Sequence, residues 1–491
     1  MARCLFAALV PALAACAPPV RPPAYTPRDE VPLAGTPTGI AGWPSPEWWK
    51  RYDDPQLDRL IDLATKDSPN LEQADARYRT ALRAVDTQKA NLSPQVRGLL
   101  DGSHGFSDIK LHGQAPGATG STQGFQLDPG RSWSNNVIAG ALFTWDLDLW
   151  GKQKDAVAAA VGQARAAEAE RATASSSLQL NVAMTYFNWQ AINARLALAH
   201  EAEHQAEDFR GLVKLRVDHG LDDPTTMDQA DAQLASQRQQ LAALEGGAAL
   251  DLAQLAAIVG VSPQELGKLD ARPLPVADTT LPPDARLELI ARRPDIVAAR
   301  WQIEAASRSI DSARKAYYPD VSLMALGAFL RTWPDLGSGT RTDLALGNVG
   351  PSIQLPIYSG GRLKAAVESS QAALDTAVAA YNAAVVQAAQ DVSRQILTMQ
   401  QLGAEQTQQA LSLQANVSQD RRTGERRNRG IIDDRQYITT QLQVIEQKDS
   451  QLQLAAQLLS TNLTLINALG GGYHTDHLPA LPAATAKDET Q

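Results

Sequence analysis

Alternation of apolar and polar residues marks short segments in each half of the chain as β-strands. Segment 136–149 is the clearest, because every second side chain in it is apolar: Val137, Ala139, Ala141, Phe143, Trp145, Leu147 and Leu149. A membrane β-barrel with lipid outside and water inside has this alternation over segments of about ten residues. A soluble antiparallel sheet with one solvated face has the same pattern. Alternation alone therefore leaves both structures open.

Runs rich in Ala, Gln and Leu predict long helices around these strands. The two longest predicted helices contain about 67 residues each, which corresponds to roughly 100 Å. Such helices do not fit into a compact domain, so the pattern predicts an elongated bundle. In the two halves of the chain, a first helix of about 35 residues ends near Pro94 or Pro319, the long helix spans about 152–218 or 362–428, the turn lies at Gly220 or Gly430, and a last helix spans about 225–258 or 432–468.

The two halves are an internal repeat. Residues 68–94 align with 293–319 at an offset of 225 residues, and residues 151–260 align with 361–470 at an offset of 210. The difference, 225 − 210 = 15, places an insertion of 15 residues in the first half. Because 101–132 is rich in Gly, Ser, Asp and Pro, we expect a longer loop there.

The repeat also fixes the expected strands and their faces. We expect lipid-facing side chains at equivalent positions of the two halves, namely Phe143, Trp145 and Leu147 in the first and Ile353, Leu355 and Ile357 in the second. Four strands cannot close a barrel, which needs about eight or more. A barrel would therefore be assembled from several copies. The expected strands lie at about 95–106, 134–149, 320–330 and 344–358.

Composition and charge narrow the class of protein. The chain has 491 residues and a net charge of −9, with acidic and basic residues scattered along it, so we do not expect nucleic acid as a partner. No stretch of 18 or more apolar residues follows residue 20. A membrane-spanning part would therefore have to be a closed barrel rather than a helix.

The N-terminus predicts export and a lipid anchor. Residues 1–15 have the charge and apolar segment of a signal peptide, and the sequence Leu13-Ala14-Ala15-Cys16 resembles a bacterial lipobox. We expect Cys16 to become the lipid-modified first residue of the mature chain. An ordinary signal peptide cut near Ala15 is the alternative. Ala17 in place of Asp permits delivery to the outer membrane by analogy with lipoprotein sorting.

These boundaries give the expected domain organisation. The signal peptide and an extended leader precede the two repeats, a linker separates the repeats, and a disordered tail follows them. The ranges are 1–15 for the signal peptide, 16–50 for the lipidated leader, 51–260 for repeat 1, 261–283 for the linker, 284–472 for repeat 2 and 473–491 for the tail.

Taken together, these features resemble the TolC/OprM-type outer-membrane efflux factors, specifically their lipoprotein (NodT-like) branch. The resemblance covers about 47–473. Its carriers are Asp54-Pro55-Gln56-Leu57, Phe143-Thr144-Trp145-Asp146-Leu147-Asp148-Leu149-Trp150-Gly151, Arg293-Pro294-Asp295-Ile296, Tyr318-Pro319-Asp320-Val321, Pro356-Ile357-Tyr358-Ser359-Gly360-Gly361-Arg362 and Ala468-Leu469-Gly470-Gly471-Gly472-Tyr473.

The resemblance implies a homotrimer in the outer membrane of a Gram-negative bacterium. It implies a mainly α fold with a transmembrane β-barrel of twelve strands and a long periplasmic α-helical tunnel. Such proteins passively conduct substrates, including drugs in multidrug resistance, that an inner-membrane pump delivers through a periplasmic adaptor. They have no enzyme activity and no cofactor.

The resemblance further implies that the helix-hairpin ends close the duct and meet the adaptor. The expected residues are Gly220, Asp222, Asp223, Arg426, Arg427, Gly430, Asp433 and Asp434. Family members often carry Asp nine residues after the second glycine, where this chain has Thr439, so the acidic ring of the family is displaced or missing. Our hypothesis is that Arg–Asp pairs between neighbouring hairpins hold the end shut. Solvated charged helix ends are the alternative.

One catalytic motif occurs and is rejected. Residues 200–204 fit the H-E-x-x-H pattern, in which His200 and His204 would bind zinc and Glu201 would act as the base. The extended form of the motif is missing, because Glu207 and Arg210 stand where Gly and His would be required. We expect no metal site. The rivals from other classes are a non-conducting envelope lipoprotein (a spacer or adhesin), a periplasmic adaptor and, last, a zinc peptidase.

Overall fold

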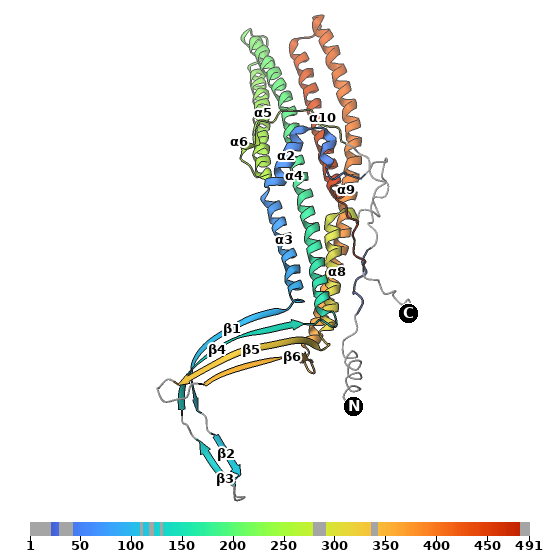
Figure 1. The fold of residues 1–491 in the computed structure, drawn as a ribbon. Helices are drawn as coiled ribbons and strands as arrows, with labels where there is room; N and C mark the ends of the chain where they lie inside the picture. Colours follow the sequence, from blue (N-terminus) through green and yellow to red (C-terminus); the bar gives the residue numbers. More distant parts are fainter. Residues whose placement is uncertain are drawn as a thin grey trace, which may run out of the picture. The chain divides into compact units, whose positions relative to one another are not determined.

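The computed structural model describes residues 21–28, 43–108, 111–116, 122–127, 131–277, 291–334 and 342–481. Cys16, the signal peptide and parts of the expected leader, linker and tail lie outside the described residues. The chain divides into two compact units: a sheet unit with residues 82–161 and 305–374, and a helical unit with residues 22–81, 162–304 and 375–491. The chain is mainly helical, with its antiparallel strands contributed by both repeats (Figure 1).

The sheet unit contains one four-stranded antiparallel sheet in the order β1-β4-β5-β6 (Figure 1). These strands are β1 (Gln95–Asp108), β4 (Arg131–Asp146), β5 (Asp320–Pro334) and β6 (Thr342–Gln354). Each repeat supplies one strand pair, and β4 pairs with β5 across the repeats. Among the described residues, β1 and β6 each have one unpaired edge.

The prediction of a longer loop at 101–132 is wrong. Strands β1 and β4 extend into this region, and two further strands, β2 (Leu111–Pro116) and β3 (Thr122–Leu127), pair as a separate hairpin. Gly, Ser and Asp do not prevent strand formation here, because backbone hydrogen bonds between adjacent segments are available whatever the side chains are. The insertion in the first repeat therefore lengthens a strand hairpin.

The register separates an apolar face of the sheet from a more polar one. Residues directly opposite each other in an antiparallel pair have side chains on the same side. Phe143 lies opposite Val96 and Ala325, so these three side chains share a face with Trp145 and Ile353. On the other face Thr332 donates a hydrogen bond of 2.8 Å to Oδ1 of Asn136. The contrast is partial, because the face of Asn136 also carries Leu142 and Leu326.

Three of the residues expected on the lipid-facing strands lie beyond the strand ends. Strand β4 ends at Asp146 and β6 at Gln354, so Leu147, Leu355 and Ile357 are outside them. Leu147 still donates its N–H to the Val321 carbonyl at 3.0 Å. The alternation in the sequence continues beyond the last paired residues. The strands end earlier because the chain must turn into the next helix.

The helices follow the predicted repeat closely. The long helices are α4 (Lys152–Asp218) and α9 (Arg362–Asn428), with the predicted bounds. The other helical elements are η1 (Trp48–Tyr52), α2 (Pro55–Asp67), α3 (Pro69–Ala90), α5 (Pro224–Val259), α6 (Pro263–Leu266), α8 (Pro294–Lys315) and α10 (Asp434–Ala468).

The prediction of a single first helix of about 35 residues is wrong. In the first repeat it is broken into α2 and α3, because Ser68 is extended and Pro69 starts a new helix. Proline fits the first turn of a helix, where its missing N–H leaves no hydrogen bond unmade, and it constrains the preceding residue to extended backbone. In the second repeat α8 has 22 residues and begins at Pro294.

The core of the helical unit is built where η1, α2, α4, α5 and α10 meet. Trp48, Leu60, Tyr186, Leu255 and Leu463 are among its buried side chains. The Tyr186 hydroxyl donates to Oδ2 of Asp54 at 2.6 Å, and burial raises the pKa of that hydroxyl well above its usual range. Among the described helices, α5 is the one apolar and long enough to cross a membrane by length and composition. Its C-terminal end instead packs into this core.

A buried arginine joins the start of repeat 2 to its end. The Arg293 guanidinium donates to the carbonyl of Ala468 at 3.1 Å and pairs with Asp295 at 2.7 Å and Asp391 at 3.4 Å. Gly470 passes so close to this segment that a Cβ would overlap the carbonyl of Arg292. Its φ of +103° is also unfavourable for other residues.

We therefore predict that Gly470→Ala destabilises the protein by about 2 kcal/mol or more per protomer. The matched control is Gly211→Ala in the C-terminal part of α4, where a Cβ would meet nothing within 4 Å. That substitution should stabilise the protein by roughly 0.5–1 kcal/mol, because alanine favours helix. Urea unfolding followed by circular dichroism measures both, and equal stabilities would contradict the packing described.

Candidate gate at the hairpin ends

The two hairpin ends have the same backbone geometry. The turn from α4 to α5 has Gly220 at φ +69°, and the turn from α9 to α10 has Gly430 at φ +70°. The next residue closes the helix in each case, since Leu221 N–H donates to the Arg216 carbonyl at 2.8 Å and Ile431 N–H to the Arg426 carbonyl at 2.9 Å. This is the Schellman ending, which requires a residue tolerant of positive φ.

Two of the expected gate residues cap the returning helices. Oδ1 of Asp223 accepts from the Thr225 N–H at 2.8 Å, and Oδ1 of Asp433 accepts from the Gln436 N–H at 3.1 Å. These bonds satisfy N–H groups that have no partner within the helix. Asp223 and Asp433 thus fix where α5 and α10 begin.

Asp222 links the two hairpins. It accepts two hydrogen bonds from Arg216 of its own hairpin, at 2.7 and 2.9 Å, and one from Arg435 of α10 at 2.8 Å. Arg435 also pairs with Asp433 at 2.9 Å. The hydrogen bond from Arg216 is the main reason that the pKa of Asp222 is lowered, and the charge of Arg435 adds to it. Asp222 is therefore a shared acceptor between repeats.

The other expected pair lies inside one hairpin. Arg427 of α9 pairs with Asp434 of α10 and stacks over the ring of Tyr437, 5.0 Å from its centre. This pair therefore does not join neighbouring hairpins within the chain. Arg426 is exposed and makes no side-chain hydrogen bond or ion pair with the residues that the structure describes.

A second link between the hairpins lies further along the bundle. Arg195 of α4 makes a two-pronged ion pair with Asp449 of α10, at 2.6 and 3.1 Å, and both side chains are largely buried. No sequence motif indicated this pair. Arg435 was not among the expected gate residues, and its partner Asp222 lies 213 residues away in the sequence.

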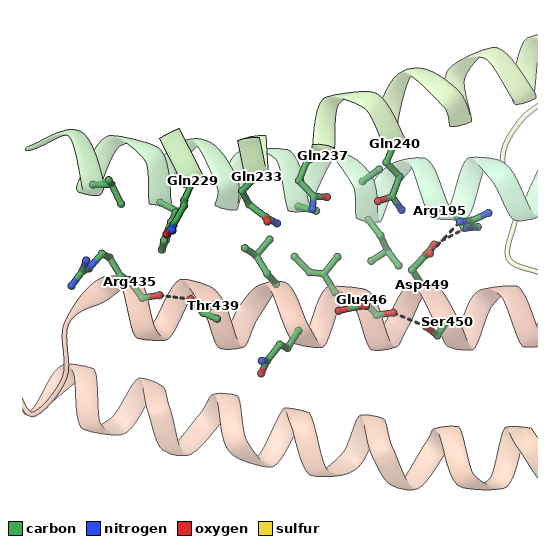
Figure 2. Close-up of a pocket in the computed structure, with 18 of the residues that line it drawn as sticks. Arg195, Gln229, Gln233, Gln237, Gln240, Arg435, Thr439, Glu446, Asp449 and Ser450 are labelled. Carbon is green, nitrogen blue, oxygen red and sulfur yellow. Dashed lines mark hydrogen bonds and ion pairs between the residues drawn. The ribbon is translucent and has the colours of Figure 1, made fainter. Parts of the chain in front are cut away.

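A cavity of about 750 Å³ lies between the hairpins, bounded by these two links. Arg195 and Asp449 line one end of it and Arg435 the other, as Figure 2 shows. The α5 wall carries four glutamines, Gln229, Gln233, Gln237 and Gln240. Buried apolar side chains of α4, including Ala199, Ala202 and Val213, also line it. Between the Arg435–Asp222 link and the Arg195–Asp449 link, the two hairpins are therefore separated by this cavity.

The rejected zinc motif lies on the exposed part of α4. His200, Glu201 and His204 are exposed, and His204 Nδ1 lies 3.3 Å from Oδ2 of Asp208. Among the described residues there is no group of three or more His, Cys, Asp or Glu side chains that could hold a metal ion. Glu203, on the same segment, pairs with Arg238 of α5. Glu203 and Glu207 thus both pair with Arg238 across the first hairpin.

Comparison with known proteins identifies relatives over nearly the whole chain. The model of the family "Outer membrane efflux protein" matches residues 60–261 and 286–471. The multidrug resistance outer membrane protein MdtP of Escherichia coli (strain K12) is 30% identical over 451 residues, which are 91% of this chain and 89% of that protein. Its name assigns it to multidrug resistance.

Solved structures with the same fold include two outer-membrane proteins. The outer membrane protein VceC of Vibrio cholerae is 28% identical, with a TM-score of 0.72 over 88% of this chain and 100% of that one. The CmeC outer membrane channel of Campylobacter jejuni has a TM-score of 0.73 at 20% identity, covering 94% of this chain and 96% of that one.

The lowered pKa of Asp222 predicts how the link between the hairpins depends on pH. Because the folded pKa lies below the unfolded value of about 3.9, the contribution of this carboxylate is present above that value and is lost as pH falls through the folded pKa. The distance between the two hairpins should stay constant from pH 8 to 5 and should increase only in stronger acid. Pulsed electron spin resonance between labels at Ala232 and Gln436 measures this. A change in separation between pH 7 and 5 would contradict the assignment.

Proposed function

The chain belongs to the outer membrane efflux protein family, and on that premise we propose that three copies form one duct, anchored by lipid and closed at its hairpin ends. The protein is an outer-membrane efflux channel of a Gram-negative bacterium and not an enzyme. Channels of this family act with a periplasmic adaptor and an inner-membrane pump. As MdtP is named for multidrug resistance, we assign this chain diverse small molecules as cargo.

The unpaired edges of the sheet carry the proposal of a trimer. Strands β1 and β6 leave backbone N–H and C=O groups without partners at the two edges of the sheet described here. Such groups cannot be left unpaired in lipid, so a spanning sheet must close on itself. Pairing β6 of one copy with β1 of the next satisfies both edges. Three copies would give twelve strands, within the usual range for such barrels.

The apolar face of the sheet supports its placement toward lipid. Leu100 and Val349 are 80% and 76% exposed in the single chain, which is unfavourable in water but suits contact with lipid. Aromatic side chains lie toward both ends of this face, with Trp145 at one end and Trp133 and Phe106 at the other. Aromatic girdles at the two membrane interfaces are typical of outer-membrane barrels.

The N-terminal segment supports an anchor at Cys16. Residues 21–28 lie along α9, where Ala24 N–H donates to Asp375 at 2.6 Å and Asn382 both accepts from Arg28 N–H and donates to the Thr26 carbonyl, each at 2.9 Å. Seven residues lie between Cys16 and Ala24, so the chain between them can reach roughly 27 Å if extended. The stretch of α9 from its start to Asp375 is roughly 20 Å long. A lipidated Cys16 can therefore return to the level where α9 begins, as expected for the lipoprotein (NodT-like) branch.

The hairpin ends are the proposed gate and adaptor-docking surface. Asp222 and Arg435 hold the two hairpins of one chain together, while Gly220 and Gly430 form the ends. Leu221 and Ile431, at equivalent positions of the repeat, are 65% and 59% exposed there. Exposed aliphatic side chains at a charged end are suited to binding another protein. We assign this surface to the adaptor.

We expect Asp222→Asn to open the duct, because the amide cannot keep ion pairs with both Arg216 and Arg435. Single-channel recording in planar bilayers should show severalfold longer openings than the wild type. Arg427→Gln is the matched control, since it breaks a pair inside one hairpin and should change the openings less. Trimers of Asp222→Asn that conduct like the wild type would contradict this gate.

The lipid anchor has its own test. Cys16→Ser should abolish incorporation of labelled palmitate and reduce the fraction of protein that sediments with the outer membrane, because the acyl chains are lost. Cys4→Ser is the control and should leave labelling unchanged, since Cys4 precedes the expected cleavage site. Persistent labelling of Cys16→Ser would refute the anchor.

A further inference from the structure

Four arginines near the end of α9 make no ion pair with the residues that the structure describes. Arg421, Arg422, Arg426 and Arg429 are all exposed. Arg422 donates to the backbone carbonyl of Ser418 at 3.1 Å, which leaves its charge uncompensated. Arg422 and Arg426 lie one turn apart on α9, and Arg429 follows directly after the helix end with its N–H bonded to the Glu425 carbonyl at 3.2 Å. We term Arg422, Arg426 and Arg429 the arginine stripe.

The carboxylates near the arginine stripe are mostly engaged elsewhere. Asp434 pairs with Arg427, Asp433 pairs with Arg435, and Asp420 accepts from the Thr440 hydroxyl at 3.3 Å. The Thr440 hydroxyl is neutral, so Asp420 keeps its negative charge, and together with the exposed Glu425 it can offset two of the four positive charges. The end of this hairpin therefore carries surplus positive charge that stays in contact with solvent.

The equivalent end of repeat 1 has no such surplus. Residues 210–225 hold three basic and three acidic side chains, whereas the equivalent residues 420–435 hold six arginines and four carboxylates. The positions that match Arg421, Arg422 and Arg429 are Gly211, Leu212 and His219. Arg216, which matches Arg426, is held by Asp222. The positive charge is thus a property of one hairpin of the two.

We propose that this surplus makes the periplasmic entrance of the duct favour anions, and that small organic anions belong to its cargo. The inference rests on the proposed channel function, in which the hairpin ends surround the entrance. Uncompensated charge at a narrow mouth raises the local concentration of the opposite ion. At physiological salt this effect extends about 8 Å, so charges at the rim act on ions entering between the hairpins.

The reversal potential in a tenfold KCl gradient tests this directly, with the wild-type trimer in a planar bilayer. Chloride should be more permeant than potassium. Arg426→Gln with Arg429→Gln should lower the chloride-to-potassium permeability ratio about twofold or more. The effect should shrink near 1 M salt, where charges are screened within about 3 Å. Replacing chloride with benzoate tests the preference for an organic anion.

The matched control removes two exposed arginines of α3, as Arg77→Gln with Arg79→Gln, and should leave the permeability ratio unchanged. A wild-type channel that prefers potassium would overturn the inference. So would a ratio that is equally unaffected by both double variants, while the channel function itself would stand. Folded trimers without any conductance would overturn the channel function, and the anion preference with it.

Discussion

The need to pair every backbone hydrogen-bonding group inside a membrane governs this protein. Each repeat folds one strand pair, and the two pairs join through β4 and β5 into a sheet that, among the residues the structure describes, still has two unpaired edges. In water such edges invite aggregation, and in lipid they are excluded. The proposed closure across identical copies resolves both problems. In that assembly, symmetry, lipid contact and passage of cargo all follow from closure.

The duplication also explains the geometry of the proposed gate. Both repeats end a long helix with the same glycine turn, so each chain presents two similar hairpins that differ in charge. Asp222 of the first accepts from Arg435 of the second, and Arg195 pairs with Asp449 further along. Between these links lies a cavity lined by glutamines. Hairpins joined by few polar contacts around open space can separate without disrupting the apolar core, as a gate requires.

The sequence predicted what is encoded locally. Helices α4 and α9 match their predicted bounds because their long Ala-rich runs end at glycines in left-handed turns. The break at Pro69 and the β2–β3 hairpin were missed, because helix capping and strand pairing there outweighed composition. At the proposed gate, Asp223 and Asp433 were expected next to the glycine turns, and the structure shows that they cap α5 and α10. The Asp222–Arg435 and Arg195–Asp449 pairs join segments more than 200 residues apart, and a single sequence contains no signal for them.

The mass of the intact assembly tests the central claim most directly. Native mass spectrometry of protein extracted from membranes in mild detergent should give three times the mass of the lipidated chain, because only closure between copies pairs the edges β1 and β6. The trimer should persist until the detergent is made denaturing. A monomer or dimer that retains its strand content would contradict closure across three copies, and with it the duct.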